Sequence, residues 1–268
     1  MPTITLLTDF GTRDPYVAAM KGVLVSRCSA PVVDLSHEIA PFDLLGAAFF
    51  LRDVVAYWPA GTIFVVVVDP GVGTSRRMIA VARDSRIFLA PDNGVLHFEC
   101  RTGSQPAQRS VDAGPAESRP HTYSIENSAL FLPNGSNTFH GRDRFAPVAA
   151  ALANGLPLAD LGPPIDDPVP LPYVEPVYEE ERITGTVIGI DRFGNILTDI
   201  ARLPFPPCAR IGSTTIDQIA RTYGEAAGLC FVVGSAGRLE IAMPQASAAD
   251  LLHLRAGDRL DITKCRTE

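Results

Sequence analysis

The sequence predicts an α/β protein: an N-terminal α/β domain with a largely parallel central sheet, then a smaller C-terminal β domain, barrel-like or sandwich-like. In the first half of the chain, short apolar runs alternate with helical patterns, which is typical of a parallel sheet with helices on its faces. A proline-rich stretch over residues 161–178 indicates an extended connector. The last third holds short alternating segments separated by glycine, proline or asparagine, which favours a β domain. We therefore place the domains at residues 1–169 and 170–268.

The expected elements of the N-terminal domain follow from apolar periodicity and from the residues that interrupt it. Strands are expected at residues 3–8, 31–35, 63–68, 78–82 and 87–90, and helices at residues 16–25, 43–51 and 148–153. Asp43 is a candidate N-cap of the second helix. Residues 101–128 are polar, so we expect a surface excursion there.

The C-terminal domain is expected to be built from short strands with few helical residues. The predicted strands lie at residues 182–190, 196–200, 228–233, 239–243 and 258–263, with a possible further strand at 207–209 and helical character near 246–254. The turn at 191–195 exposes Asp191 and Asn195 together. A hairpin turn alone also explains that pattern.

Composition limits the classes of function. With 268 residues and 46% hydrophobic content, the chain can bury one large core or two moderate ones. A net charge of −7 and no marked basic patch argue against binding to nucleic acid or to an anionic membrane. The N-terminal stretch has no basic region or cleavage site, and no apolar run approaches the roughly 18 residues of a membrane span, so we expect a cytoplasmic protein. The five cysteines stand singly, without metal-binding spacing, and we expect them to be reduced.

The candidate functional residues stand at the ends of predicted strands. Four valines at 65–68 form a buried strand that stops at Asp69 and Pro70. Asp9 follows the first strand in the same way. Ligands bind at the carboxyl ends of strands in open α/β sheets, so both carboxylates are candidates. The alternatives are an Asp-Pro turn for Asp69, and a turn residue or helix cap for Asp9.

The glycines at 71–73 do not form a nucleotide-binding loop, because the third glycine of a dinucleotide fingerprint and the Gly-Lys-Ser/Thr of a P-loop are both missing. What remains is the pair Asp69 and Arg76. His140 stands just before a predicted helix, where it could also be a cap or loop residue. Arg142 and Arg144 fall in the first turn of that helix, where the dipole disfavours cations, so something other than helix stability is expected to keep at least one of them there.

Other single residues are less informative. His37 is expected to be an ordinary loop histidine, and Phe42 is either a core residue or one that flanks a ligand. The sequence identifies no partner for His97.

Six ordered motifs together resemble the DUF62 family of S-adenosyl-L-methionine hydrolases, also called hydroxide adenosyltransferases, which are related to fluorinase and chlorinase. The resemblance covers essentially the whole chain. The motifs lie at residues 8–11, 68–77, 90–94, 138–143, 191–195 and 234–237.

The resemblance implies roles for particular residues. Asp69, Arg76 and His140 match the catalytic triad of the hydrolases, whereas the halide-using relatives replace the aspartate by tyrosine and the histidine by another residue. Asp9 matches a residue that binds the ribose hydroxyls. The expected substrate-binding set is completed by Asp191, Asn195 and Ser235 around the methionine portion, and by Phe42, Asn93 and Gly141. Ala236 stands where the fluorinase has an arginine. Family members resemble homotrimers with sites between the N-terminal domain of one subunit and the C-terminal domain of the next.

The implied reaction is attack of water on the 5′ carbon of S-adenosylmethionine, which releases adenosine and L-methionine. The substrate is then the small-molecule partner, and no separate cofactor or metal is expected, since no ligand cluster of usual spacing occurs. Because a neighbouring Arg76 weakens Asp69 as a base, His140 is expected to accept the water proton near neutral pH, with Asp69 sharing it. The alternatives are a halide transferase, and a non-catalytic nucleoside or S-adenosylmethionine binding protein.

Overall fold

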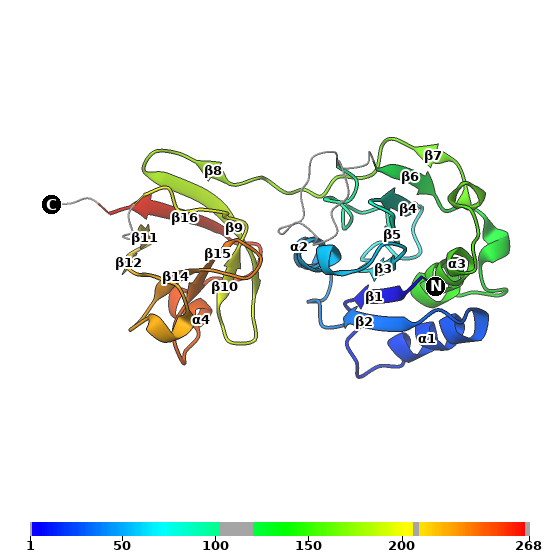
Figure 1. Ribbon diagram of the computed structural model, residues 1–268, viewed down its shortest axis with the longest axis horizontal. Helices are drawn as coiled ribbons and strands as arrows, with labels where there is room; N and C mark the ends of the chain where they lie inside the picture. The colour runs from blue at the N-terminus through cyan, green and yellow to red at the C-terminus, as the bar shows by residue number, and fades with distance from the viewer. Residues whose placement is uncertain (1, 102–119, 206–208, 266–268) are drawn as a thin grey trace. The chain divides into compact units, whose positions relative to one another are not determined.

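The computed structural model describes residues 2–101, 120–205 and 209–265. The chain divides into two compact units, Met1–Pro172 and Tyr173–Glu268, each built around a sheet (Figure 1). Within the described residues, no helix is both long and apolar enough to cross a membrane.

The N-terminal unit is a mixed α/β layer structure, which confirms the predicted fold class. Its described strands follow the order β2-β1-β3-β5-β4-β6-β7. Strands β2, β1, β3 and β5 are parallel, and β4, β6 and β7 continue the sheet in antiparallel pairs. The strands are β1 (Ile4–Thr8), β2 (Val32–Ser36), β3 (Ile63–Val67), β4 (Met78–Arg83), β5 (Arg86–Pro91), β6 (His121–Ser124) and β7 (Pro164–Ile165).

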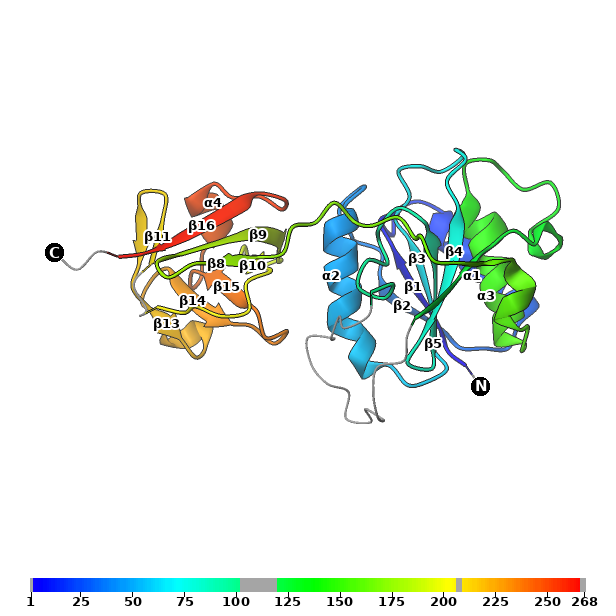
Figure 2. The ribbon, with the colours of Figure 1, turned by 90° about the horizontal axis from the view of Figure 1, so that it is seen from above.

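Helices cover both faces of this sheet, with α2 on one side and α1 and α3 on the other (Figure 2). Alternate side chains of a strand point to opposite faces, so Val65 of β3 packs in the core with α1 and α3, whereas Val66 packs in the core with α2. A strand buried on both faces needs apolar residues at every position, which explains the valine run. The helices are α1 (Tyr16–Arg27), α2 (Leu44–Val54) and α3 (Ala146–Ala153), with short turns η1 (Val55–Tyr57), η2 (Ser128–Leu130), the π-helical η3 (Gly141–Phe145) and η4 (Leu158–Leu161).

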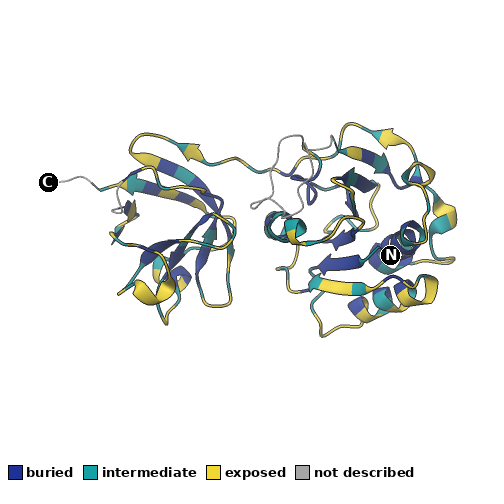
Figure 3. Ribbon diagram, viewed as in Figure 1, coloured by how far each residue is buried: buried dark blue, intermediate teal, exposed yellow. Residues whose placement is uncertain are grey.

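Several local predictions hold. The carboxylate of Asp43 accepts a hydrogen bond from the Gly46 N–H at 2.8 Å, so it is the N-cap of α2. The buried strands β1 and β3 appear dark blue in Figure 3, and α1 has exposed residues on its outer face.

Two local predictions need correction. Strand β6 lies inside the stretch expected to be a surface excursion, of which residues 102–119 are outside the described residues. Its sequence is polar, and it is held by backbone pairing with β4 rather than by an apolar face. Arg142 and Arg144 lie in the π-helical turn η3, which precedes α3, and not in the first turn of an α-helix. His37 lies in a loop, as predicted, and it is buried at 4% exposure.

In its described residues, the C-terminal unit is a curled, mostly antiparallel sheet with the short α-helix α4. Described strands follow the order β12-β11-β16-β9-β10-β15-β14-β13, and β8 pairs with β9. Strands β8, β12 and β13 escape prediction because two or three residues carry too little periodicity. The elements are β8 (Val177–Tyr178), β9 (Arg182–Ile190), β10 (Ile196–Thr198), β11 (Ala209–Ile211), β12 (Thr214–Ile216), β13 (Ile219–Ala220), η5 (Tyr223–Glu225), β14 (Cys230–Val233), β15 (Leu239–Ala242), α4 (Ala248–Leu252) and β16 (Arg259–Lys264).

The cysteines differ from the expectation that all five are reduced. Cys265 is disulfide-bonded, whereas Cys28, Cys100 and Cys230 are free thiols. Cys208 lies outside the described residues. Single spacing in the sequence carried no signal for this bond, because a disulfide depends on distance in the fold.

Candidate active site

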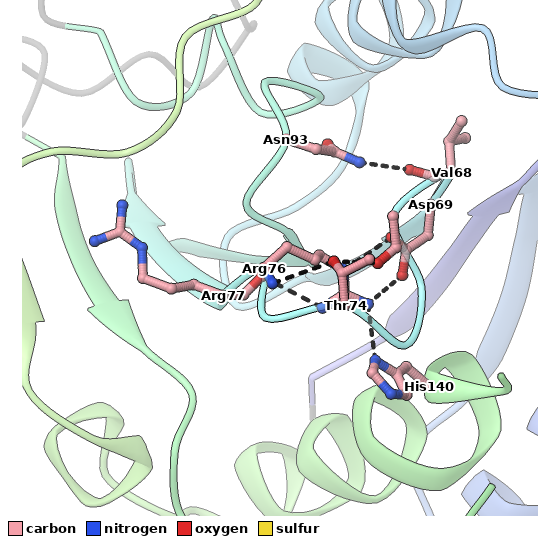
Figure 4. Close-up of polar contacts among 8 residues, drawn as sticks. Val68, Asp69, Thr74, Arg76, Arg77, Asn93 and His140 are labelled. Carbon is pink, nitrogen blue, oxygen red and sulfur yellow. Dashed lines mark hydrogen bonds and ion pairs between the residues drawn. The ribbon is translucent and has the colours of Figure 1, made fainter. Parts of the chain in front are cut away.

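Asp69, Arg76 and His140 meet at the edge of the sheet where the parallel strands end (Figure 4). The Nε of Arg76 donates a hydrogen bond to Asp69 Oδ1 at 2.8 Å, and its Nη2 donates to Asp69 Oδ2. The same Nη2 lies 2.8 Å from Nδ1 of His140. The His140 residue is buried, with 2% exposure, and the side chains of Asp69 and Arg76 are nearly so, with exposures of 5% and 10%. Arg76 therefore joins the other two groups through its guanidinium.

The position of Asp69 follows from the register of β3. Because side chains alternate along a strand, continuing the alternation past Val67 places Asp69 on the side where α3 packs. Asn93 supports this position: its Nδ2 donates to the carbonyl oxygen of Val68 at 2.9 Å. The carboxylate is thus held just beyond the end of a rigid strand.

A tight loop turns the chain from Asp69 back to Arg76. The Thr74 hydroxyl donates to the Gly71 carbonyl at 2.7 Å and accepts from the Arg76 N–H at 3.3 Å. Gly73 has φ +82°, and a Cβ there would lie 2.9 Å from the Asn137 carbonyl oxygen. The loop can therefore pack against the segment before His140 only with glycine at this position.

The two adjacent arginines have different roles. The side chain of Arg77 points away from the cluster (Figure 4). Its Nε donates to Asp92 at 2.8 Å, and its Nη1 donates to Asp167 at 2.7 Å. Arg77 therefore ties the segment near residue 167 to the sheet, and only Arg76 of the pair belongs to the cluster.

The hydrogen bond from Arg76 fixes the protonation of His140. A guanidinium can only donate, so Nδ1 of His140 must be the acceptor, and the proton of the neutral ring sits on Nε2. Burial, together with the positive charges of Arg144 and Arg76, lowers the pKa of His140 to about 4. The ring is therefore neutral at pH 7, and its basic lone pair faces a cation. This geometry argues against the proton-acceptor role expected for His140.

Arg142 and Arg144 are kept near the start of α3 by side-chain contacts. Arg142 donates to both oxygens of Asp143, at 2.6 and 2.9 Å. Burial opposes ionisation of Asp143, but hydrogen bonds from Arg142 and from the Ser136 N–H hold its pKa below its usual range. Arg144 lies over the Phe131 ring, 5.5 Å from its centroid. These contacts explain why cations occur here despite the helix dipole.

Asp9 lies at the same sheet edge, after β1. Its Oδ2 accepts a hydrogen bond from the Phe42 N–H at 2.9 Å. Phe42 has φ +67°, which is strained for a residue with a side chain, and its side chain is 68% exposed. Strain of this kind clusters at ligand sites, so the structure favours Phe42 as a residue that flanks a ligand over a core residue.

Two further predicted residues have scaffold contacts. Both ends of the Asn93 amide are engaged, since its Oδ1 also accepts from the Val95 N–H at 3.2 Å. A Cβ at Gly141 would lie 3.0 Å from the sulfur of Met20, so the absence of a side chain lets the chain after His140 pack against α1. A substrate-binding role for either residue stays a prediction.

The predicted methionine-side residues lie in turns of the C-terminal unit. Asp191 accepts hydrogen bonds from the Asn195 side chain at 2.8 Å and from the Asn195 N–H at 2.9 Å. These bonds build the β9–β10 turn and leave Phe193 at its tip, 78% exposed. Ser235 lies in a separate turn, between β14 and β15.

Sequence reasoning missed an aromatic cluster beside the candidate site. The rings of Phe10, Tyr16 and Phe139 lie with centroids 5.4 to 5.9 Å apart. The cluster joins the segments that carry Asp9 and His140. The sequence does contain a signal for this cluster, because Phe10 directly follows Asp9 and Phe139 directly precedes His140.

No group of three or more histidine, cysteine, aspartate or glutamate side chains within the described ranges is arranged to hold a metal ion. The cluster of Asp69, Arg76 and His140 consists of one carboxylate, one guanidinium and one imidazole.

The chain is similar to known proteins over most of its length. The model of the SAM hydroxide adenosyltransferase N-terminal domain matches residues 4–162, and that of the C-terminal domain matches residues 185–261. The chain is 40% identical to the (R)-S-adenosyl-L-methionine hydrolase of Thermus thermophilus, over 96% of this chain and 98% of that protein. It is 26% identical to a fluorinase of an Actinoplanes species, over 98% of each. A solved structure of an uncharacterized conserved protein from Thermotoga maritima is similar with TM-score 0.84 and 35% identity, covering 98% of this chain and 100% of that one.

The Gly73→Ala substitution is expected to destabilise the N-terminal unit more than Gly61→Ala. Both glycines have nearly the same conformation, φ +82° and +83°, but a Cβ at Gly61 meets nothing within 4 Å. The additional clash at Gly73 should lower the free energy of unfolding by a further 1 to 3 kcal/mol, roughly. Urea denaturation of both variants measures the difference, and equal losses would contradict the close packing of this loop.

Proposed function

Because the chain belongs to the SAM hydroxide adenosyltransferase family, we propose that it hydrolyses S-adenosylmethionine to adenosine and L-methionine. The observation that carries the proposal is the buried cluster of Asp69, Arg76 and His140 at the ligand-binding edge of the sheet. The similarity to a named hydrolase over nearly the full length of both chains supports the same reaction.

In the proposed reaction, the oxygen of water forms a bond to the 5′ carbon while the carbon–sulfur bond breaks, and its electron pair returns to sulfur. Methionine leaves as a neutral thioether, so the leaving group needs no proton. One proton is released from the attacking water. The site must therefore hold a water molecule in line with the carbon–sulfur bond and take up that proton.

Arg76 suits the task of holding the water. Within the described part of the chain, four of its five N–H groups donate to Asp69, His140 and the Arg77 carbonyl, which leaves one on Nη1 to donate to a water oxygen. A cation next to an oxygen that gains hydroxide character contributes about 4 kcal/mol at 4 Å, for an effective dielectric constant of about 20. The low exposure of the cluster favours this interaction.

Asp69 is the group best placed to accept the proton. Each carboxylate oxygen offers about two acceptor sites, and each accepts one bond from Arg76, so a further bond from water is available. A carboxylate is a weak base, but a protonated alcohol is a strong acid. A weak base is therefore sufficient once the new carbon–oxygen bond is forming.

His140 then serves as a positioning residue for Arg76. Its Nδ1 accepts from Nη2 of the guanidinium, and its neutral ring adds no positive charge to a site that must receive a sulfonium. Its Nε2 is buried without a hydrogen-bond partner among the described residues.

The remaining parts of the proposal are that the protein assembles as a homotrimer, acts in the cytoplasm and uses S-adenosylmethionine as its substrate without a separate cofactor. The six ordered sequence motifs support these parts through the family resemblance. Asp9 is proposed to bind the ribose hydroxyls, since a carboxylate can accept a bond from each of two neighbouring hydroxyls.

Incubation with S-adenosylmethionine in oxygen-18 water should place one label in the 5′ hydroxyl of adenosine and none in methionine. Mass spectrometry of the separated products measures this. A parallel reaction with added chloride tests the halide-transferase alternative. Unreacted substrate would support a binding protein, and a 5′-chloro nucleoside would support halide transfer; either outcome would contradict the proposal.

The variants His140→Asn and His140→Ala separate positioning from proton acceptance. An asparagine oxygen can take the place of Nδ1 as an acceptor for Arg76, so His140→Asn should keep kcat within about tenfold of wild type, whereas His140→Ala should lose about a hundredfold. The wild-type rate should show no histidine inflection between about pH 5.5 and pH 8, because the pKa of His140 is about 4. Equal losses in both variants, with a wild-type inflection near pH 6.5, would restore His140 as the base.

A further inference from the structure

We propose that His37 is a positioning residue for Asp9, which it holds through a buried hydrogen bond with Thr8 while its other ring nitrogen contacts Asp34. The inference rests on the proposed function, in which Asp9 binds the ribose hydroxyls. His37 lies in the loop after β2 and makes no contribution to the Asp69 cluster described above.

The contacts of His37 and its partners run from the surface to the end of β1. The Nζ of Lys21 donates to Asp34 Oδ2 at 2.6 Å. The other oxygen of Asp34 lies 3.0 Å from His37 Nε2, and His37 Nδ1 lies 2.9 Å from the Thr8 hydroxyl. Thr8 is fully buried and His37 is 4% exposed, whereas the Asp34 side chain is 39% exposed.

The two ring nitrogens of His37 face different partners. Burial opposes ionisation of Asp34, but contacts with Lys21 and His37 hold its pKa below its usual range, and its Oδ1 lies against His37 Nε2. The Thr8 hydroxyl oxygen accepts from the Phe10 N–H at 3.2 Å, so its own hydrogen is free to be donated to His37 Nδ1.

His37 forms hydrogen bonds with the chain on both sides of Asp9. Its ring bonds to the side chain of Thr8, immediately before Asp9, and its carbonyl oxygen accepts from the Gly11 N–H at 2.7 Å, two residues after it. Gly11 has φ +65°, so the chain turns sharply here. The turn that presents Asp9 is thus fixed by one residue from a neighbouring strand's loop.

The hydrogen bonds of His37 are expected to restrict the orientation of the Asp9 carboxylate. One of its oxygens already accepts from the Phe42 N–H, so Asp9 couples the loop before α2 to the end of β1. Binding two neighbouring hydroxyls requires a carboxylate of fixed orientation, because freezing a mobile group on binding costs affinity. Loss of the His37 ring should therefore weaken the ribose contact while the Asp69 cluster stays intact.

The test compares His37→Ala with wild type on S-adenosylmethionine and on its 2′-deoxy analogue, which lacks one hydroxyl. The variant should raise KM for S-adenosylmethionine by about fivefold to tenfold with kcat changed less than twofold. The 2′-deoxy analogue offers Asp9 only one hydroxyl to bind. On this analogue, the increase in KM should therefore shrink to about twofold or less. His121→Ala, which changes an exposed histidine of the same unit, is the matched control and should match wild type on both substrates.

Two further variants keep the test decisive if His37→Ala does not fold. His37→Asn retains an acceptor for the Thr8 hydroxyl and should recover most of the lost KM. Asp34→Ala, at a half-exposed position, should show the same substrate dependence as His37→Ala with a smaller increase.

Equal KM increases on both substrates, or a loss confined to kcat, would overturn the positioning role. A wild-type enzyme that turns over neither substrate would instead refute the proposed function, so the two failures are distinguishable.

Discussion

The guanidinium of Arg76 donates hydrogen bonds to a carboxylate and to an imidazole that are far apart in the sequence, and the rest of the site depends on this interaction. A buried carboxylate or guanidinium alone would be strongly disfavoured. Paired through two parallel bonds, the two groups satisfy each other in a site with little solvent. The same guanidinium requires the histidine to be an acceptor, so one interaction sets the charge and the protonation of the whole cluster.

The fold brings Asp69, Arg76 and His140 to the same edge of the sheet. Parallel pairing of β1, β2, β3 and β5 brings their carboxyl ends to one edge, where Asp9, His37 and Asp69 all follow a strand. Strand β4 begins at this edge too, because Met78 pairs with Pro91 at the end of β5, so Arg76, just before β4, lies near Asp69. The π-helical turn before α3 then brings His140 to the same edge. The buried valines of β3 thus have a functional consequence, because they hold Asp69 in a fixed place.

Strong periodicity made the α/β class, the helices of the N-terminal unit and the longer strands predictable from the sequence, and motif order identified the family and the cluster residues. The features that were not predicted from the sequence have physical explanations. Strand β6 is polar and held by backbone pairing, strands β8, β12 and β13 are too short to show a period, and the disulfide of Cys265 depends on proximity. The role expected for His140 followed from the ordinary pKa of histidine; only the contact with Arg76 showed that its lone pair is occupied. His37 was passed over because burial of a polar loop residue leaves no mark in a single sequence.

Nitrogen-15 NMR of the histidine rings tests the central claim most directly, with His140→Asn used to assign the signal. At about pH 7, the account predicts a neutral His140 that carries its proton on Nε2 and has an unprotonated, hydrogen-bonded Nδ1. Replacement of Arg76 by methionine should change the Nδ1 signal. A doubly protonated ring, or a ring with its proton on Nδ1, would contradict the account, because neither form can accept a hydrogen bond from Arg76 at that atom.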